Sequence, residues 1–181
     1  MKICGHIRID EIGRIVIPKE MRKVLKLDES RLAEMYIDKD KLVIKRYSPL
    51  CYKKDFLKRI VMVLSKAFNC ECIAGSREKV IAVSCESLSQ MEGRSLTQAF
   101  AGILKDKAPL ILNVNEGAEM VEIVKNYSVD YSALALVGVD SQISRLGFIC
   151  LINLNGSGGF SDENLQILKV AKELILLSID V

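Results

Sequence analysis

Four basic side chains near the start of the chain have the types and spacing of a surface that binds polyanions. They are Arg8, Arg14, Arg22 and Lys23. Gly13 permits a tight backbone turn immediately before a strand, so the two arginines on either side of that turn can project from one edge. Pro18 opens a short helix that carries the other two cations. Guanidinium groups donate to phosphate oxygens and to guanine edges, so this set predicts contact with nucleic acid.

An ordinary alternative exists for the same cations. Asp10, Glu11 and Glu20 lie within a few residues of them, and pairing with these carboxylates on a solvated surface is what composition alone favours. The distribution of charge supports the first interpretation. Residues 1–55 hold 14 Lys and Arg against 9 Asp and Glu, a balance of +5, whereas the remainder stands at −2 within a net charge of +3. Such an asymmetry indicates a polyanionic partner for the first part only.

Short strands and one short helix must position these cations. We predict strands at residues 7–9 and 15–17, a helix at 18–25, and strands at 32–37 and 41–47. A unit of about 50 residues buries too little surface to be stable alone unless disulfides, a metal or another chain complete it. We therefore expect an obligate dimer, in which the four cations of each chain become eight on one face.

The second part of the chain has the pattern of an α+β domain. Ser48-Pro49-Leu50 interrupts the first pattern, and we expect domains at residues 1–49 and 56–181, with a linker at 50–55. The expected elements are a helix at 55–69, strands at 71–74 and 79–84, a helix at 94–105, strands at 110–114, 132–139 and 147–154, and a closing helix at 161–181 capped by Ser161 or Asp162. Residues 117–127 fit a helix or a loop. This order predicts a central antiparallel sheet with helices at both ends.

Cysteine and histidine usage argues against metal binding and thiol catalysis. The chain has one histidine, His6, and six cysteines, Cys4, Cys51, Cys70, Cys72, Cys85 and Cys150. Cys70 and Cys72 are one residue apart and no second pair faces them, which is not the spacing of a structural zinc site. A redox-active thiol at Cys70, Cys72 or Cys85 is the enzymatic alternative, but Glu71 and Glu86 disfavour the thiolate there. We expect reduced structural cysteines, no cofactor and no enzymatic activity.

Two stretches of the first part resemble a known family. Residues 10–23, Asp-Glu-Ile-Gly-Arg-Ile-Val-Ile-Pro-Lys-Glu-Met-Arg-Lys, and residues 36–49, Tyr-Ile-Asp-Lys-Asp-Lys-Leu-Val-Ile-Lys-Arg-Tyr-Ser-Pro, resemble the N-terminal DNA-binding domain of the AbrB family of transition-state regulators. The resemblance spans nearly all of residues 2–49. It implies a swapped-hairpin β-barrel dimer, in which strands of two chains interleave.

The same resemblance implies roles for the basic residues. The family's DNA-contacting positions fall on Arg8, Arg14, Arg22 and Lys23. This chain departs from the family pattern at Lys23, where a second arginine is common, and that change weakens one bidentate contact. It also has Ser30-Arg31 where Gly-Asp is common, which alters the local turn and not the fold.

The order of elements after residue 56 fits a GAF-like domain, and a GAF-like domain follows the DNA-binding domain in a sporulation regulator of this family. The resemblance implies a homotetramer, with the helices at 55–69 and 161–181 packing between subunits. For any one residue of those helices, packing within its own domain is an equal alternative. A pocket for a small-molecule effector would be lined by residues 83–88, 113–131 and 133–137. These residues do not indicate which ligand would bind, and a domain with a purely structural role is the alternative.

These expectations add up to a DNA-binding regulator of sporulation or stationary-phase genes, located in the cytoplasm with the nucleoid. Its partners would be double-stranded DNA and further copies of itself. An antitoxin-like autoregulator is the alternative, and it would need a polar, unstructured tail where residues 56–181 show dense apolar periodicity. No uncharged apolar run approaches the roughly 18–20 residues of a membrane span.

Overall fold

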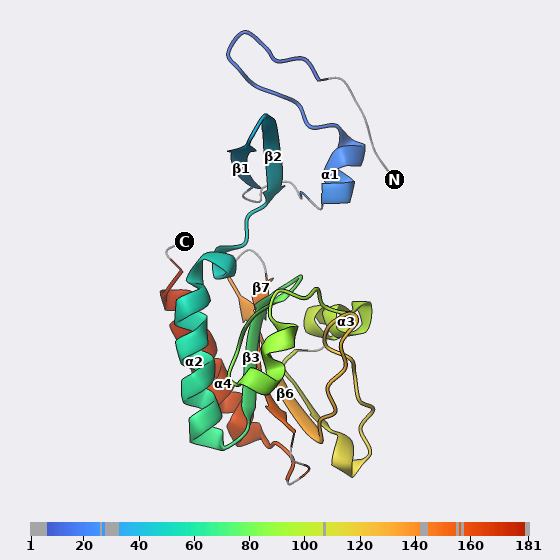
Figure 1. Cartoon of the computed structure of the whole chain (residues 1–181), viewed down its shortest axis with the longest axis vertical. Helices are drawn as coiled ribbons and strands as arrows, with labels where there is room; N and C mark the ends of the chain where they lie inside the picture. The colour runs from blue at the N-terminus through green and yellow to red at the C-terminus, as the bar shows by residue number, and fades with distance from the viewer. Residues whose placement is uncertain are drawn as a thin grey trace. The chain divides into compact units, whose positions relative to one another are not determined.

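The computed structural model divides the chain into two compact units, Met1–Tyr47 and Ser48–Val181. We call them the N-terminal and the C-terminal unit (Figure 1). The structure describes residues 7–25, 27, 33–106, 108–141, 145–154, 156 and 158–179. Within these ranges, no helix has the length and apolar character needed to cross a membrane.

The described part of the N-terminal unit contains one helix and one hairpin. They are α1 (Lys19–Leu25), β1 (Ala33–Asp38) and β2 (Lys41–Arg46), and the two strands pair antiparallel. Lys39, with φ 56°, supplies the left-handed turn between the strands. The strands predicted at 7–9 and 15–17 are reduced to one antiparallel bridge between Ile9 and Ile15. A strand needs a neighbour for its backbone hydrogen bonds, and the described part of this unit offers these two segments only each other.

The N-terminal unit of a single chain has no core among its described residues, because none of the side chains between residues 7 and 47 is buried. Val16 is 79% exposed and Ile37 is 77% exposed. The large hydrophobic residues that remain exposed are Ile7, Ile9, Ile12, Val16, Val24, Leu25, Met35, Tyr36, Ile37, Leu42 and Tyr47. So much exposed apolar surface on so small a unit is typical of an interaction surface.

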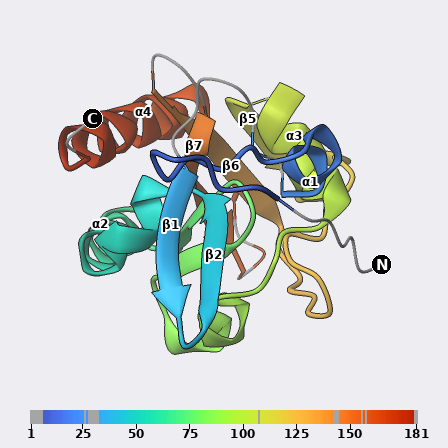
Figure 2. The same cartoon turned by 90° about the horizontal axis from the view of Figure 1, so that it is seen from above.

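The C-terminal unit is built on an antiparallel five-stranded sheet in the order β4-β3-β7-β6-β5. Its strands are β3 (Glu71–Ser76), β4 (Val80–Val83), β5 (Leu110–Asn113), β6 (Ala133–Asp140) and β7 (Arg145–Asn153). Its helices are α2 (Lys54–Phe68), α3 (Gln98–Asp106) and α4 (Asp162–Leu177), with short 3-10 turns η1 (Pro49–Lys53), η2 (Glu86–Met91) and η3 (Val114–Glu116). Figure 2 shows α2 and α4 on one side of the sheet and α3 on the other. The predicted α+β domain with an antiparallel sheet is confirmed.

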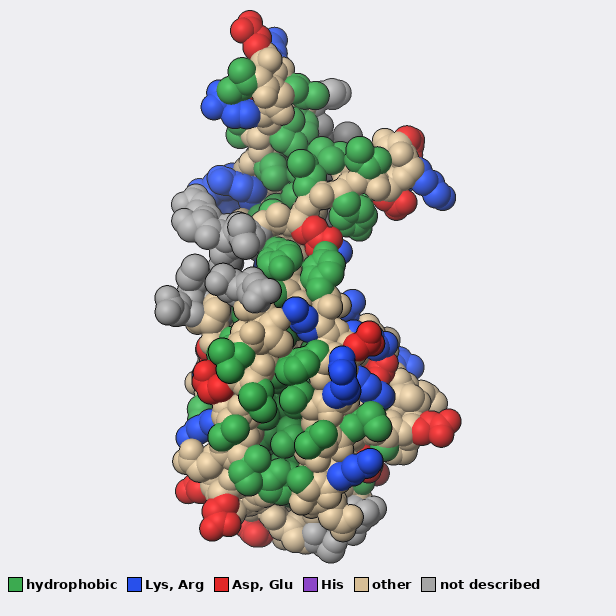
Figure 3. All heavy atoms as spheres, turned by 90° about the vertical axis from the view of Figure 1, so that its left-hand side faces the viewer, with side chains coloured by type: hydrophobic (Ala, Val, Ile, Leu, Met, Phe, Trp, Pro, Cys, Tyr) green, Lys and Arg blue, Asp and Glu red, His purple; other side chains and the backbone are tan. Residues whose placement is uncertain are grey.

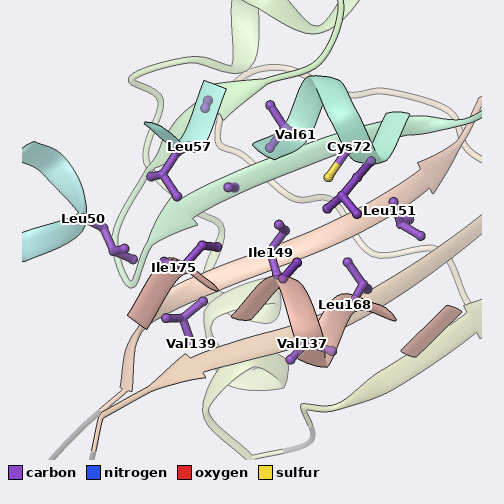
Figure 4. Close-up of a cluster of buried hydrophobic side chains, with 14 of the residues drawn as sticks. Leu50, Leu57, Val61, Cys72, Val137, Val139, Ile149, Leu151, Leu168 and Ile175 are labelled. Carbon is purple, nitrogen blue, oxygen red and sulfur yellow. The ribbon is translucent and has the colours of Figure 1, made fainter. Parts of the chain in front are cut away.

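Buried apolar side chains lie on both faces of this sheet. On one face, side chains of η1 and α2, the sheet and α4 point toward one another around Ile149 and Leu151 (Figure 4). On the other face, Phe100 of α3 meets Phe148 of β7 edge to face, with ring centroids 5.2 Å apart. Because both faces of the sheet are covered, the sequences of the central strands are nearly continuous runs of apolar residues.

Two local details differ from the sequence prediction. Residues 50–55, predicted as a linker, form η1 and the first residues of α2. Leu50 is only 1% exposed. Gly147 has no side chain and so leaves room for it; a Cβ atom at that position would lie 2.5 Å from the Leu50 Cδ1 atom. Helix α3 begins at Gln98, four residues later than predicted, because Ser95 and Leu96 instead form antiparallel bridges with Lys79 and Val124. Residues 117–127, predicted as a helix or a loop, contain no helix, so the loop alternative holds.

The start of α4 agrees with its prediction. Ser161 is the N-cap, and the Asn164 side chain accepts from its backbone N–H at 2.8 Å in a capping box.

Candidate nucleic-acid interface

Residues 10–14 form a tight, exposed turn that we call the tip loop. The Asp10 N–H donates to the Arg14 carbonyl at 3.1 Å, and the Gly13 N–H donates to the Asp10 carbonyl at 2.9 Å. Gly13 has φ +82°, a conformation that side chains other than glycine rarely adopt. The backbone of Asp-Glu-Ile-Gly-Arg therefore forms a hydrogen-bonded turn, as predicted from Gly13.

The Asp10 carboxylate connects the backbone of the tip loop to the Arg14 side chain. Its Oδ1 atom accepts from the Ile12 N–H at 3.2 Å and the Arg14 N–H at 2.7 Å. Its Oδ2 atom accepts from Arg14 Nε at 2.8 Å. The Arg14 guanidinium holds the pKa of Asp10 below its usual value, so the carboxylate is ionised at neutral pH. The Arg14 side chain nevertheless stays 74% exposed.

Helix α1 carries the second pair of predicted cations. Lys23 is exposed, and its Nζ atom lies 3.5 Å from Glu20 Oε1. Arg22 is partly buried, and its N–H donates to the carbonyl of Pro18 at 3.0 Å. Arg8 is exposed before the tip loop. The structure thus places Arg8 and Arg14 on either side of one turn, as expected, and Arg22 and Lys23 next to each other on one short helix.

The alternative pairing of these cations is present in part. Arg14 pairs with Asp10 and Lys23 pairs with Glu20, both on exposed surface. Exposed ion pairs add little to stability and are readily screened, so a phosphate group can replace Glu20 at Lys23, while Arg14 stays 74% exposed even as it pairs with Asp10. Pairing within one chain therefore does not argue against a polyanionic partner.

Sequence reasoning treated Asp10 only as a competing carboxylate, and missed its contacts with both the backbone and the side chain of Arg14. The spacing of an aspartate three residues before a glycine was the available signal, because aspartate side chains commonly accept from the backbone N–H two residues ahead in such turns.

Parts of the segments expected to line an effector pocket are buried in the apolar core. Val83, Leu88, Ile123, Leu134 and other members of these segments are buried together on the α3 side of the sheet. The loop before β6 is fixed to this core through Tyr131, whose hydroxyl bonds the N–H and the carbonyl of Val121 at 2.9 and 3.0 Å.

A polar depression of about 350 Å³ lies elsewhere, at the end of α2. It is lined by Ser65, Lys66, Asn69, Cys70, Glu71, Ser87, Asn153 and Leu154. Of the predicted lining, only Ser87 borders it.

Three of the thiols, Cys70, Cys72 and Cys150, lie in surroundings that disfavour the thiolate. Burial and the charge of Glu71 raise the pKa of Cys70 to about 11, and burial raises the pKa of Cys72 and Cys150 well above the usual value. The cysteines in the described part of the chain, Cys51, Cys70, Cys72, Cys85 and Cys150, are all free. Cys4 and His6 lie outside the described residues. Within the described ranges, no cluster of His, Cys, Asp and Glu has the arrangement of a metal site.

Comparison with known proteins gives matches to each unit. No protein-family model matches the chain. The chain is 25% identical to stage V sporulation protein T of Bacillus subtilis over 161 residues, 88% of this chain and 89% of that protein. It is 44% identical to the transition state regulatory protein AbrB of Bacillus subtilis over 50 residues, 27% of this chain and 52% of AbrB.

A solved structure matches the fold of the C-terminal unit. The GAF-B domain of DevS from Mycobacterium smegmatis superposes with a TM-score of 0.51 at 10% identity, over 66% of this chain and 87% of that domain. The predicted resemblance to AbrB-type regulators is confirmed, and the C-terminal fold is GAF-like.

Proposed function

We propose that this chain is a DNA-binding transcriptional regulator of sporulation or stationary-phase genes, and that its N-terminal unit docks on duplex DNA as a dimer. The observation that carries the proposal is the 44% identity to AbrB over 50 residues, in the part of the chain that holds the exposed cations. The match to stage V sporulation protein T over 88% of the chain supports the sporulation context. The place of action of such a regulator is the nucleoid.

The exposed apolar surface of the N-terminal unit supports a swapped-hairpin dimer. Met35 lies opposite Ile44 and Ile37 lies opposite Leu42, so these four side chains share one face of the β1–β2 hairpin. Three of them are more than half exposed in the single chain. A hairpin with an uncovered apolar face is marginal in water. A second copy supplies both a cover for this face and neighbours for the segments around Ile9 and Ile15.

In such a dimer, the cations act in two ways. Most of the affinity comes from phosphate contacts, which are independent of sequence, and a few arginines read base edges. Arg14 is the best placed of the four to read a base, because it lies on an exposed turn and presents a planar set of donors. Arg8, Arg22 and Lys23 would then supply mainly phosphate contacts.

The outer surface of α2 and α4 supports a tetramer made from two such dimers. We call this surface the helical face; its residues are Met62, Val63, Ile167, Val170, Leu174 and Leu177, all exposed. Figure 3 shows hydrophobic side chains gathered over this side of the C-terminal unit. On α4 they recur every three or four residues, separate from the buried stripe of Leu168, Ala171 and Ile175. Because the α3 side of the sheet is occupied by apolar side chains, we assign the GAF-like unit to oligomerisation and not to effector binding.

The alternatives fit the described residues less well. An antitoxin-like autoregulator needs a polar, unstructured tail, whereas the C-terminal unit has apolar clusters on both faces of its sheet. A redox-active GAF enzyme needs an accessible thiolate, and burial keeps Cys70 and Cys72 protonated at neutral pH.

Fluorescence anisotropy of the full-length protein on duplex DNA tests the proposal. If Arg8, Arg22 and Lys23 of each chain contact phosphates in a dimer, the logarithm of the binding constant falls with the logarithm of salt concentration with a slope of about −5, and a slope of about −7 would mean that Arg14 also contacts phosphates. Arg14→Ala should weaken binding to preferred DNA by about tenfold if Arg14 reads a base. Lys125→Ala, an exposed cation of the C-terminal unit, is the control and should change neither quantity. A slope near zero would reject the proposal.

A further inference from the structure

We infer that Asp10 is a positioning residue for sequence recognition: its carboxylate fixes the Arg14 guanidinium so that the two Nη groups face a base edge. This inference rests on the proposed function, and within the same surface it assigns base contact to Arg14 and the positioning of Arg14 to Asp10. Asp10 would lower the general affinity for DNA while raising the discrimination between sequences.

The hydrogen bonds of Asp10 carry the inference. One carboxylate oxygen accepts from two backbone N–H groups of the tip loop, at 3.2 and 2.7 Å. The other accepts from Arg14 Nε at 2.8 Å. The loop backbone and the arginine side chain are therefore held by the same group. An incidental surface pair does not do this: Glu20 contacts Lys23 through side chains only, at 3.5 Å.

The choice of Nε leaves the recognition face of the guanidinium available. A guanidinium engages guanine through two donors that match the O6 and N7 acceptors, and this pairing needs a fixed plane. A free arginine loses much of its rotamer freedom when it binds, which costs affinity. An arginine held in advance through Nε has already lost part of that freedom, while its Nη1 and Nη2 groups remain as donors. The lowered pKa of Asp10 keeps this contact intact across the neutral range.

The negative charge of Asp10 makes the inference testable. If Asp10 only repelled phosphates, its removal would tighten binding to every duplex equally. If it positions Arg14, its removal should tighten binding to unrelated DNA but weaken binding to preferred DNA. The ratio of the binding constant for preferred DNA to that for unrelated DNA distinguishes these cases. If Asp10 only stabilised the turn, a variant that keeps the turn would leave this ratio unchanged.

The experiment compares Asp10→Asn with Glu20→Gln in the full-length protein. The asparagine oxygen can still accept the backbone N–H groups of the tip loop, whereas its amide nitrogen cannot accept from Arg14 Nε. The probes are a duplex selected by the unaltered protein from a randomised library and a shuffled duplex of the same composition. We expect Asp10→Asn to lower the ratio of binding constants by about tenfold with an unchanged salt slope. Glu20→Gln should leave the ratio unchanged.

Equal ratios for both variants and the unaltered protein would overturn the inference. If the unaltered protein binds duplex DNA with a steep salt slope but selects no sequence, the inference fails and the proposed function stands; if it ignores DNA, the proposed function fails. A measurement without any variant covers the case in which Asp10→Asn does not fold. The NMR signal of the Arg14 Nε–H should exchange slowly with water, with and without the selected duplex, and rapid exchange in the complex would overturn the inference.

Discussion

The C-terminal unit buries apolar side chains on both faces of its sheet, whereas none of the described side chains between residues 7 and 47 is buried. Both units are rich in apolar residues, so hydrophobicity alone does not separate them. The difference follows from size, because a unit of about 50 residues buries a much smaller fraction of its surface than a larger domain and is marginal without a partner. Apolar sequence in a small unit thus indicates a partner, while the same composition in a larger unit indicates a core.

Ion pairs in the two units differ in a related way. In the C-terminal unit, Glu92 near η2 bonds Lys54 and Lys58 of α2, and so braces one element against another. In the N-terminal unit, Asp10 and Arg14 belong to the same five-residue turn. The first arrangement stabilises a fold that already exists, whereas the second organises a surface for a partner.

The core of the C-terminal unit should show the largest effect of a single substitution. Ile149 is fully buried between the sheet and the helices α2 and α4 (Figure 4). Ile149→Ala should lower the free energy of unfolding by about 2–5 kcal/mol, because the lost contacts leave a cavity. Ile149→Val should cost about 0.5–1.5 kcal/mol as a graded control. Urea denaturation of a fragment of residues 48–181 measures both free energies of unfolding. If Ile149→Ala lowers the free energy of unfolding by less than Ile149→Val does, this core is not well packed.

The matching substitution in the N-terminal unit tests whether a partner completes it. Ile37 is 77% exposed in the single chain, where its replacement by alanine should change stability by less than about 0.5 kcal/mol. If a second copy buries it, Ile37→Ala should cost about 2–4 kcal/mol, as in a core. The melting temperature of a fragment of residues 1–49 should then rise with protein concentration. Lys41→Ala on the same hairpin is the control. A fragment that melts independently of concentration would contradict the dimer.

Most of the fold follows from patterns that a sequence displays directly. The helical spacing of apolar residues predicts α2, and its observed bounds lie within a residue of the prediction. The residues that carried this prediction are Phe56, Ile60, Val63, Leu64 and Ala67, of which the structure buries only Leu64. The apolar runs of β6 and β7 predict central strands because both faces of the sheet are covered. The cations of the N-terminal unit were found from their residue types and from the turn at Gly13, which require no knowledge of distant contacts.

The rest depended on three-dimensional contacts that a sequence pattern does not display. Leu50 follows Pro49 and was predicted as part of a linker, whereas it packs in the core beside Gly147, which lies almost a hundred residues later and leaves room for its side chain. Asp10 carries no signal of its own in composition, since an aspartate beside arginines is common on any surface. Its role depends on which of its two oxygens meets the backbone and which meets Arg14, and that is a matter of geometry.

The helical face offers a third test, with an intermediate effect. Leu174 is 47% exposed on α4, and Leu174→Asp would place a charge within the proposed contact between dimers. We expect the mass of the full-length protein, measured by sedimentation, to fall from four chains to two. The melting of the C-terminal unit should change only through the lost association. Lys169→Asp, away from the apolar stripe of the same helix, is the control and should remain tetrameric. An unchanged mass for both variants would mean that another surface joins the dimers.

The smallest expected effect belongs to Glu92, which braces the C-terminal unit. Its Oε2 atom lies 2.9 Å from Lys54 Nζ and its Oε1 atom lies 3.3 Å from Lys58 Nζ. Lys58 Nζ also donates to the Val83 carbonyl at 2.7 Å, so the pair connects α2 to the edge strand β4. Burial alone would raise the pKa of Glu92, but the hydrogen bonds from the two lysines outweigh burial and lower it.

This lowered pKa fixes the direction of a pH effect. A carboxylate whose pKa is lower in the folded state than in the unfolded state stabilises the folded state. This contribution is complete at a pH above the ordinary glutamate pKa of 4.5, and it is lost as the pH falls through the folded-state pKa. Glu92→Gln should therefore cost about 1 kcal/mol or less at pH 7, because both lysines are partly exposed, and nothing at a pH below that window. Glu86→Gln, an exposed carboxylate of η2, is the control. Urea denaturation of residues 48–181 between pH 3 and 7 measures the difference, and an equal cost at both ends of that range would show that Glu92 acts through packing and not through its charge.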